Sequence, residues 1–186
     1  ARELTERVQV DRAAAVDSAY LVYASERGYE AAMKTVETAA LPVPDALVAI
    51  SGSELYQRGY RSPDPLWDQM LRKEWDPKPS TWVINKFFPN DLAEPGTKKE
   101  EYELVFDLKK DASSSAVELR DQVQAKLAEL GIKARVSLRG GSEGSLAIMP
   151  AAGDIGKVVS FCAKMLKIED PGSTCVFGHA GFVDSC

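Results

Sequence analysis

The alternation of hydrophobic and polar residues in the first part of the chain predicts strands separated by a helix. Two short apolar runs, AYLVYAS (19–25) and PVPDALVAIS (42–51), are typical of buried strands. Between them, apolar residues recur at helical spacing over residues 29–40, and a second helix is predicted at 65–75, where Pro65 suits the first turn. A strand, a helix and a strand in this order predict parallel pairing through a right-handed crossover.

The middle of the chain has a different pattern. DPKPS (76–80) and NDLAEPGTKKEE (90–101) are polar and contain proline, and we interpret both as loops. Residues 113–131 predict a helix that begins with a capping box formed by Ser115 and Glu118. Three strands are predicted around this helix, at residues 102–108, 133–138 and 145–150. This order of elements indicates a small α+β unit built on an antiparallel sheet.

The last part of the chain returns to the first pattern. Apolar residues at helical spacing over 155–166 predict a helix, and TCVFG (174–178) is typical of a buried strand. The chain therefore has α/β sequence at both ends and α+β sequence between them. This arrangement predicts an α/β fold, with a Rossmann-like core of residues 1–75 and 150–186 and an inserted α+β cap of residues 76–149.

Composition excludes several classes of function. The 186 residues include 23 basic and 28 acidic side chains, and a net charge of -5 gives no broad basic face for nucleic acid. No apolar run approaches the roughly 20 residues that a transmembrane helix needs. Three cysteines make an odd count, which indicates no disulfide framework and favours a reducing compartment.

Two motifs in the first part resemble a known family. YASERGYEA followed by PDALVAISGSELY resembles the sucrose-phosphate phosphatase branch of the haloacid-dehalogenase-like phosphatases, which reads roughly Y-A-T-G-R-S-Y and then P-D-x-x-I/L-x-x-x-G-S/T-E-I/L-Y. The order of core, cap and core matches as well, over about residues 18–183. The resemblance implies a Rossmann-like haloacid-dehalogenase-type core with an inserted α+β cap, and we expect the N-terminal part of this core to be incomplete.

The resemblance also implies a nucleophilic aspartate and a hydroxyl that holds phosphate. The family's D-x-D-G-T motif is missing here, and the only rival, Asp11, lacks the second aspartate and the D-G-T. Ser25 matches the hydroxyl and Arg27 is kept, but Glu26 replaces a glycine that lets the backbone approach phosphate. A carboxylate at this position adds bulk and a charge of the same sign as phosphate.

The family's remaining parts are a lysine, an acidic magnesium loop and a cap motif. At the lysine position the chain has Ile155, and Lys157 is rotated by about 200° around a helix, toward its opposite face. The magnesium loop G-D-S-x-N-D aligns with residues 178–183, where His179 and Val183 replace both carboxylates. The cap motif S-G-K-D-V-D aligns with residues 142–147, which lack its lysine and acids.

We therefore expect no catalytic, metal or cofactor site, and we interpret Ser25, Arg27, Lys157 and His179 as vestigial positions. Other interpretations of the C-terminal residues stay open. Cys175, His179 and Cys186 have the spacing C-x3-H-x6-C, which lacks a clear fourth zinc ligand. A disulfide between the two cysteines is a further alternative.

Aromatic residues gather between residues 67 and 88. They fill the seam between core and cap or, where several are exposed together, mark a protein interface. The candidates for this interface are Trp67, Trp75, Trp82, Phe87 and Phe88.

Three functions follow from these observations. We favour a catalytically inactive phosphatase-like protein that acts as an accessory subunit of a larger assembly. The alternatives are a Mg²⁺-dependent sucrose-6-phosphate phosphatase whose nucleophile lies upstream of this chain, and a regulatory sugar-phosphate-binding domain. The resemblance implies a photosynthetic organism, so we expect a chloroplast location, with the cytoplasm as the alternative.

Overall fold

The computed structural model describes residues 20–93, 101–139 and 144–167 of the chain. Contacts between Cα atoms divide the chain into two compact units. The core unit comprises Ala1–Asp68 and Asp154–Cys186, and the insert unit comprises Gln69–Gly153. The sequence pattern predicts an insert of residues 76–149, so the two divisions differ by several residues at each boundary. Within the described ranges, no helix is long and apolar enough to cross a membrane.

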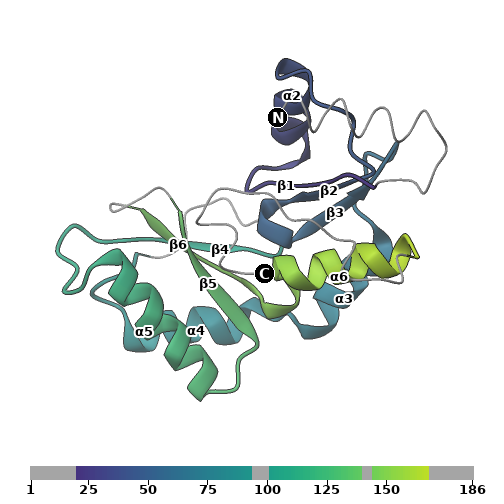
Figure 1. Ribbon diagram of the computed structural model, residues 1–186. Helices are drawn as coiled ribbons and strands as arrows, with labels where there is room; N and C mark the ends of the chain where they lie inside the picture. The colour runs from purple at the N-terminus through teal and green to yellow at the C-terminus, as the bar shows by residue number, and fades with distance from the viewer. Residues whose placement is uncertain (1–19, 94–100, 140–143, 168–186) are drawn as a thin grey trace. The chain divides into compact units, whose positions relative to one another are not determined.

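The core unit contains a three-stranded sheet with the order β1-β2-β3 (Figure 1). Strands β1 (Val22–Ala24) and β2 (Ala46–Ala49) are parallel and are joined through helix α2 (Tyr29–Thr38). Strand β3 (Glu54–Gln57) pairs antiparallel with β2. The predicted strand-helix-strand unit is confirmed. All four residues of β2 are buried because this strand lies between the other two.

The core unit also contains the first turn of helix α3 and the whole of helix α6. Helix α3 (Pro65–Glu74) begins as predicted at Pro65, and the Asp64 carboxylate caps it by accepting the Trp67 N–H at 3.0 Å. Helix α6 (Ile155–Met165) packs against the 3-10 turn η1 (Ile50–Gly52). The indole of Trp67 donates to the Gly52 carbonyl at 3.0 Å, so this turn is tied to the start of α3.

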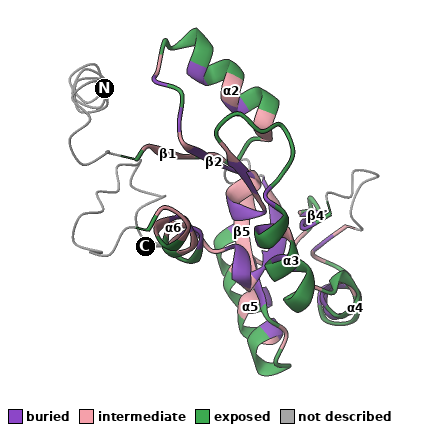
Figure 2. Ribbon diagram, turned by 90° about the vertical axis from the view of Figure 1, so that its right-hand side faces the viewer, coloured by how far each residue is buried: buried purple, intermediate pink, exposed green. Residues whose placement is uncertain are grey.

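The insert unit is an antiparallel sheet with the order β4-β6-β5, and helices α4 and α5 cover one of its faces (Figures 1 and 2). The elements are α4 (Pro77–Phe87), β4 (Leu104–Asp107), α5 (Ala116–Glu129), β5 (Ala134–Arg139), β6 (Ser145–Pro150) and the 3-10 turn η3 (Ala151–Gly153). The predicted α+β unit is thus confirmed.

The hydrophobic core of the insert unit lies between this sheet and its two helices. Alternate residues of the strands point toward the helices, as expected for a sheet with one covered face. Its fully buried members are Val83, Ile84, Phe106, Leu119, Val123, Leu127, Leu146 and Ile148.

The interpretation of DPKPS as a loop is wrong, because these residues form the first turn of α4. Proline is compatible with a first helical turn, where the backbone N–H needs no partner within the helix. Asp76 caps the helix by accepting the Lys78 N–H at 3.0 Å. The prolines therefore mark the beginning of a helix and not a break between elements.

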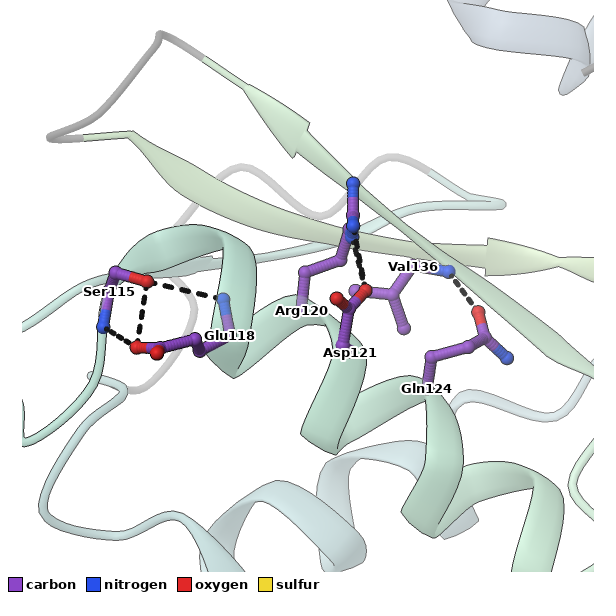
Figure 3. A network of polar contacts seen from close by, with 6 residues as sticks. All are labelled: Ser115, Glu118, Arg120, Asp121, Gln124 and Val136. Atoms are coloured by element: carbon purple, nitrogen blue, oxygen red, sulfur yellow. Dashed lines mark hydrogen bonds and ion pairs between the residues drawn. The ribbon is translucent and has the colours of Figure 1, made fainter. Parts of the chain in front are cut away.

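Helix α5 is fixed at its start and along its length by side-chain hydrogen bonds (Figure 3). The predicted capping box is present: Ser115 N–H donates to Glu118 Oε2 at 3.0 Å, and Glu118 N–H donates to Ser115 Oγ at 3.3 Å. Gln124 Oε1 accepts the Val136 N–H at 2.9 Å. Because β5 is an edge strand of this sheet, Gln124 satisfies backbone groups that no neighbouring strand reaches.

Candidate functional site

The phosphatase-like end of the core unit begins with Ser25, directly after β1. Its backbone N–H donates to the Val48 carbonyl at 2.8 Å, which continues the parallel pairing beyond the strand. Its Oγ accepts the Arg27 N–H at 3.0 Å, so the hydroxyl makes a hydrogen bond within the loop that follows the strand. Accepting this bond leaves the hydroxyl proton free to be donated. Ser25 is partly exposed, so its side chain is accessible.

The loop after β2 has an unusual backbone conformation. Ile50, Ser51 and Gly52 have φ values of 48°, 52° and 99°. Glycine tolerates positive φ, but a β-branched residue such as isoleucine rarely adopts it, and such conformations cost about 1–3 kcal/mol each. The surrounding contacts must hold this loop in place.

Those contacts join the loops at the ends of the two parallel strands. Ser51 N–H donates to the Ser25 carbonyl at 3.0 Å, and Ile50 N–H donates to the Arg27 carbonyl at 3.2 Å. A phosphate-binding loop presents such backbone N–H groups to the anion. Here the two N–H groups are engaged by protein carbonyl groups, so they are not available to a ligand.

The charges at this end of the sheet are mixed. Glu26 and Arg27 follow Ser25 directly, and both are exposed.

Within the described ranges, no group of three His, Cys, Asp or Glu side chains is arranged to hold a metal ion. The described residues therefore offer no cluster of carboxylates that fits Mg²⁺.

The start of α6 carries the position that matches the family's lysine. Ile155 occupies it and is 8% exposed, so an apolar side chain packs into the core there. Asp154 caps the helix by accepting the Gly156 N–H at 2.9 Å, which places a carboxylate at this terminus. Lys157 is exposed, whereas Ile155, Val158 and Cys162 are buried. The side chain of Lys157 therefore projects from the other side of the helix, as its spacing predicts.

Cys162 belongs to the core, as expected from its position on an apolar stripe. Its side chain is buried. Burial, assisted by the nearby charge of Asp64, raises the pKa of the Cys162 thiol to about 11. A thiol with this pKa is not a nucleophile near neutral pH.

Several predicted residues lie outside the described ranges. They are Asp11, Cys175, His179, Val183 and Cys186. The zinc and disulfide alternatives and the replaced magnesium loop therefore stay predictions from sequence. Of the emptied cap motif, the structure describes residues 144–147, where Leu146 and Ala147 are buried and Ser145 Oγ donates to Asp107 at 2.7 Å.

The predicted aromatic interface is only partly compatible with the structure. Trp67 and Phe88 are 1% and 8% exposed, so including them was wrong: each packs inside its own unit. Trp75 is partly buried, and its indole donates to the Glu101 carbonyl at 3.2 Å. Trp82 and Phe87, at 50% and 39% exposed, are the members of the set that reach the surface.

Trp82 and Phe87 lie on α4 close to two lysines that the sequence prediction missed, Lys86 on α4 and Lys126 on α5. The two rings meet edge to face, with their centres 5.8 Å apart. Lys86 Nζ lies 4.6 Å from the centre of the Trp82 ring, and Lys126 Nζ lies 4.5 Å from that of Phe87. A groove of about 590 Å³ runs beside Trp82, lined by α4 residues and by Glu101 and Leu104. The helical spacing of the lysines around Trp82 would have indicated this surface had α4 been predicted.

Comparison with known proteins identifies relatives of this chain. Residues 2–182 match the family described as sucrose-6F-phosphate phosphohydrolase. Sucrose-phosphatase 1 of Nicotiana tabacum is 26% identical over 140 residues, and sucrose-phosphatase 2 of the same plant is 24% identical over 167 residues. These matches cover 74% and 89% of this chain but only 32% and 38% of the relatives. The chain therefore spans roughly a third of the length of these curated relatives.

Solved structures share the fold at low sequence identity. The sucrose-phosphatase of Synechocystis sp. PCC6803, solved in complex with sucrose and phosphate, has a TM-score of 0.67 at 20% identity, covering 91% of this chain and 66% of that one. A haloacid dehalogenase-like hydrolase of Bacillus subtilis has a TM-score of 0.62 at 7% identity, covering 88% and 63%. The α/β fold is that of the haloacid-dehalogenase-like proteins, as expected.

Proposed function

Since this chain belongs to the sucrose-6F-phosphate phosphohydrolase family, we propose that it keeps the family's fold without its chemistry and acts by binding another protein. The observation that carries this proposal is the start of α6. A buried Ile155 and the carboxylate of Asp154 stand where the resemblance implies a cationic lysine. An accessory subunit of a larger assembly is the role that this combination favours.

The physical argument concerns the charge that phosphoryl transfer must overcome. An anionic nucleophile that approaches an anionic phosphate needs a cation and aimed hydrogen-bond donors. Here Glu26 and Asp154 add negative charge, and the N–H groups of Ile50 and Ser51 are bound to protein carbonyls. His179 and Val183 also replace the acids of the magnesium loop. Several groups that phosphoryl transfer needs are replaced at once, and together these replacements favour a loss of phosphatase activity more strongly than any one of them would.

An enzyme assay tests this proposal directly. The longest natural chain that contains these residues, so that any upstream nucleophile is present, is incubated with sucrose 6-phosphate and Mg²⁺. We expect no phosphate release above the rate of a matched Ser25→Ala variant. Turnover that exceeds this control would contradict the proposal.

One observation favours the phosphatase alternative. Ser25 keeps an accessible hydroxyl at the end of a parallel strand, with its proton free, as a phosphate ligand requires. In that alternative, a segment upstream supplies the nucleophile and Ser25→Ala lowers the rate of phosphate release. Thermal stabilisation by sucrose 6-phosphate without turnover would instead favour a regulatory sugar-phosphate-binding domain.

A chloroplast location stays part of the proposal. It rests by association on the relatives from a photosynthetic organism. Fluorescence of the tagged, full-length protein in a photosynthetic cell tests it, and a cytoplasmic signal would contradict it.

A further inference from the structure

The outer side of α4 carries an exposed combination of aromatic and basic residues. Lys78, Trp82 and Lys86 are spaced four residues apart, so they line one side of the helix, and Phe87 follows at its end. We call these four residues, with the groove beside Trp82, the α4 face. All of it lies within the insert unit. The opposite side of the helix contributes Val83 and Ile84 to the core, so the orientation of α4 is fixed.

The side chains that define the α4 face carry positive charge. Of the described carboxylates near it, Glu101 pairs with Arg72 at 2.7 Å, Glu129 pairs with Lys126 at 2.9 Å, and Asp76 accepts the Lys78 N–H as the cap of the helix. In the part of the chain that the structure describes, Lys78 and Lys86 make no ion pair with a carboxylate. Two cations therefore flank an aromatic ring that is half exposed.

The shape of the α4 face fits a segment of chain. The groove of about 590 Å³ is larger than one side chain, and it is open to solvent beside Trp82. Most of its exposed lining surface is apolar, and Pro77, Trp82 and Leu104 line it together with the charged Lys78 and Glu101. Aromatic side chains next to a groove are the residues that most often dominate the binding energy of protein interfaces.

We propose that the α4 face docks an acidic segment of a partner protein. An apolar side chain of that segment enters the groove against Trp82, and its carboxylates pair with Lys78 and Lys86. This inference rests on the proposed function, because it names the surface and the partner chemistry of a protein that acts by binding. A second copy of this chain is a poorer occupant, since a two-fold contact of the α4 face with itself would bring its lysines together.

Selection from a peptide library tests the chemistry of the partner. The probe is a phage-displayed library of random 12-residue peptides, and the bait is the full chain. We expect the enriched peptides to carry an aromatic or leucine residue flanked by at least two acidic residues. Enrichment of basic or uncharged sequences would overturn the proposal, as would enrichment that does not depend on Trp82.

Variants locate the binding surface. With one enriched peptide made synthetically, Trp82→Ala and Lys86→Glu are each expected to weaken binding by about tenfold or more. The control Lys34→Glu reverses another exposed helical lysine, in the core unit, and should leave the affinity unchanged. Circular dichroism checks that each variant folds. If Trp82→Ala does not fold, Lys86→Glu alone still tests the proposal.

Other occupants of the α4 face give different results. Self-association that Trp82→Ala abolishes would overturn the proposal in favour of a second copy, and a shift of the Trp82 indole resonance with sucrose would overturn it in favour of a carbohydrate. The phosphatase assay is independent of this test. Phosphate release together with acidic-peptide binding would overturn the loss of chemistry and leave the docking surface standing.

Discussion

The backbone N–H of Ser51 donates a hydrogen bond to the carbonyl oxygen of Ser25 at 3.0 Å. This bond joins the loops that follow the parallel strands β1 and β2, although the two residues are far apart in sequence. It also holds Ser51 at a φ of 52°, where serine is strained. The end of the sheet where the resemblance implies a phosphate site is therefore closed by contacts between the two loops.

Replacing Ser51 tests how much this bond stabilises the core unit. Ser51→Pro removes the N–H and cannot adopt a positive φ, so we expect a loss of about 3 kcal/mol in the free energy of unfolding. Ser51→Gly keeps the N–H and tolerates positive φ, so it should be at least as stable as the parent chain. Urea unfolding measures both, and equal stability of the two variants would show that the bond contributes nothing.

Gln124 offers a test in the insert unit. Its side chain accepts the Val136 N–H and donates to the Ala134 carbonyl at 3.1 Å. Gln124→Leu leaves both backbone groups without this partner, so we expect a loss of about 2 kcal/mol and faster hydrogen exchange at Val136. Gln122→Leu is the matched control, because Gln122 is exposed, and it should cost less than about 0.5 kcal/mol.

The capping box of α5 predicts a dependence of stability on acid. Hydrogen bonds from the Ser115 N–H and then from its hydroxyl lower the pKa of Glu118 below its usual value. The folded state therefore favours the charged carboxylate. This contribution is fully present above the unfolded pKa, near 4.5, and is lost as the pH falls below that value through the lower folded pKa.

Two variants separate the cap from the charge. Ser115→Ala is expected to lower the free energy of unfolding by about 1 kcal/mol at neutral pH. Glu118→Gln should abolish the acid-dependent part, so its stability relative to the parent chain improves as the pH falls. Unfolding curves at several pH values decide the matter, and parallel pH profiles of the parent and Glu118→Gln would contradict the prediction.

The buried thiol of Cys162 leads us to expect the opposite effect, a loss of stability as the pH rises into the alkaline range. Its pKa is raised to about 11 by burial, so the folded state favours the neutral thiol. The stability from this preference is complete below the unfolded pKa, near 9, and is lost as the pH rises toward 11. The parent chain should therefore lose roughly 2 kcal/mol relative to Cys162→Ala between about pH 8 and pH 11. A constant difference between the two proteins over this range would refute it.

Local patterns predicted most of the elements but not all of them. The capping box at Ser115 and the apolar run of β2 depend on neighbouring residues, so their spacing in the sequence is sufficient to find them. Helix α4 escaped prediction because its two early prolines are also typical of loops. The hydrogen bond from the Lys78 N–H to the Asp76 carboxylate shows that a helix begins here and not a loop, but this bond is visible only in the folded structure.

The aromatic residues between 67 and 88 mark the limit of such patterns. Trp67 and Trp82 are the same residue type in similarly amphipathic helices, yet one is 1% exposed and the other 50%. Trp67 is buried because Gly52 and Phe161, distant in sequence, pack around it. Nothing in the spacing of either tryptophan along the chain specifies those neighbours.

The amino-acid order alone was enough to predict the family and the alternation of α/β and α+β segments, and it led to the prediction that Ile155 stands where the family has a lysine. These are properties of single positions and of short-range spacing. Folding was needed to bring the Ser51 N–H to the Ser25 carbonyl. It was also needed to place Trp82 at the surface against Lys86, between two lysines that form no ion pair among the described residues. Both outcomes depend on contacts between distant segments, and the burial that those contacts create cannot be computed from one segment at a time.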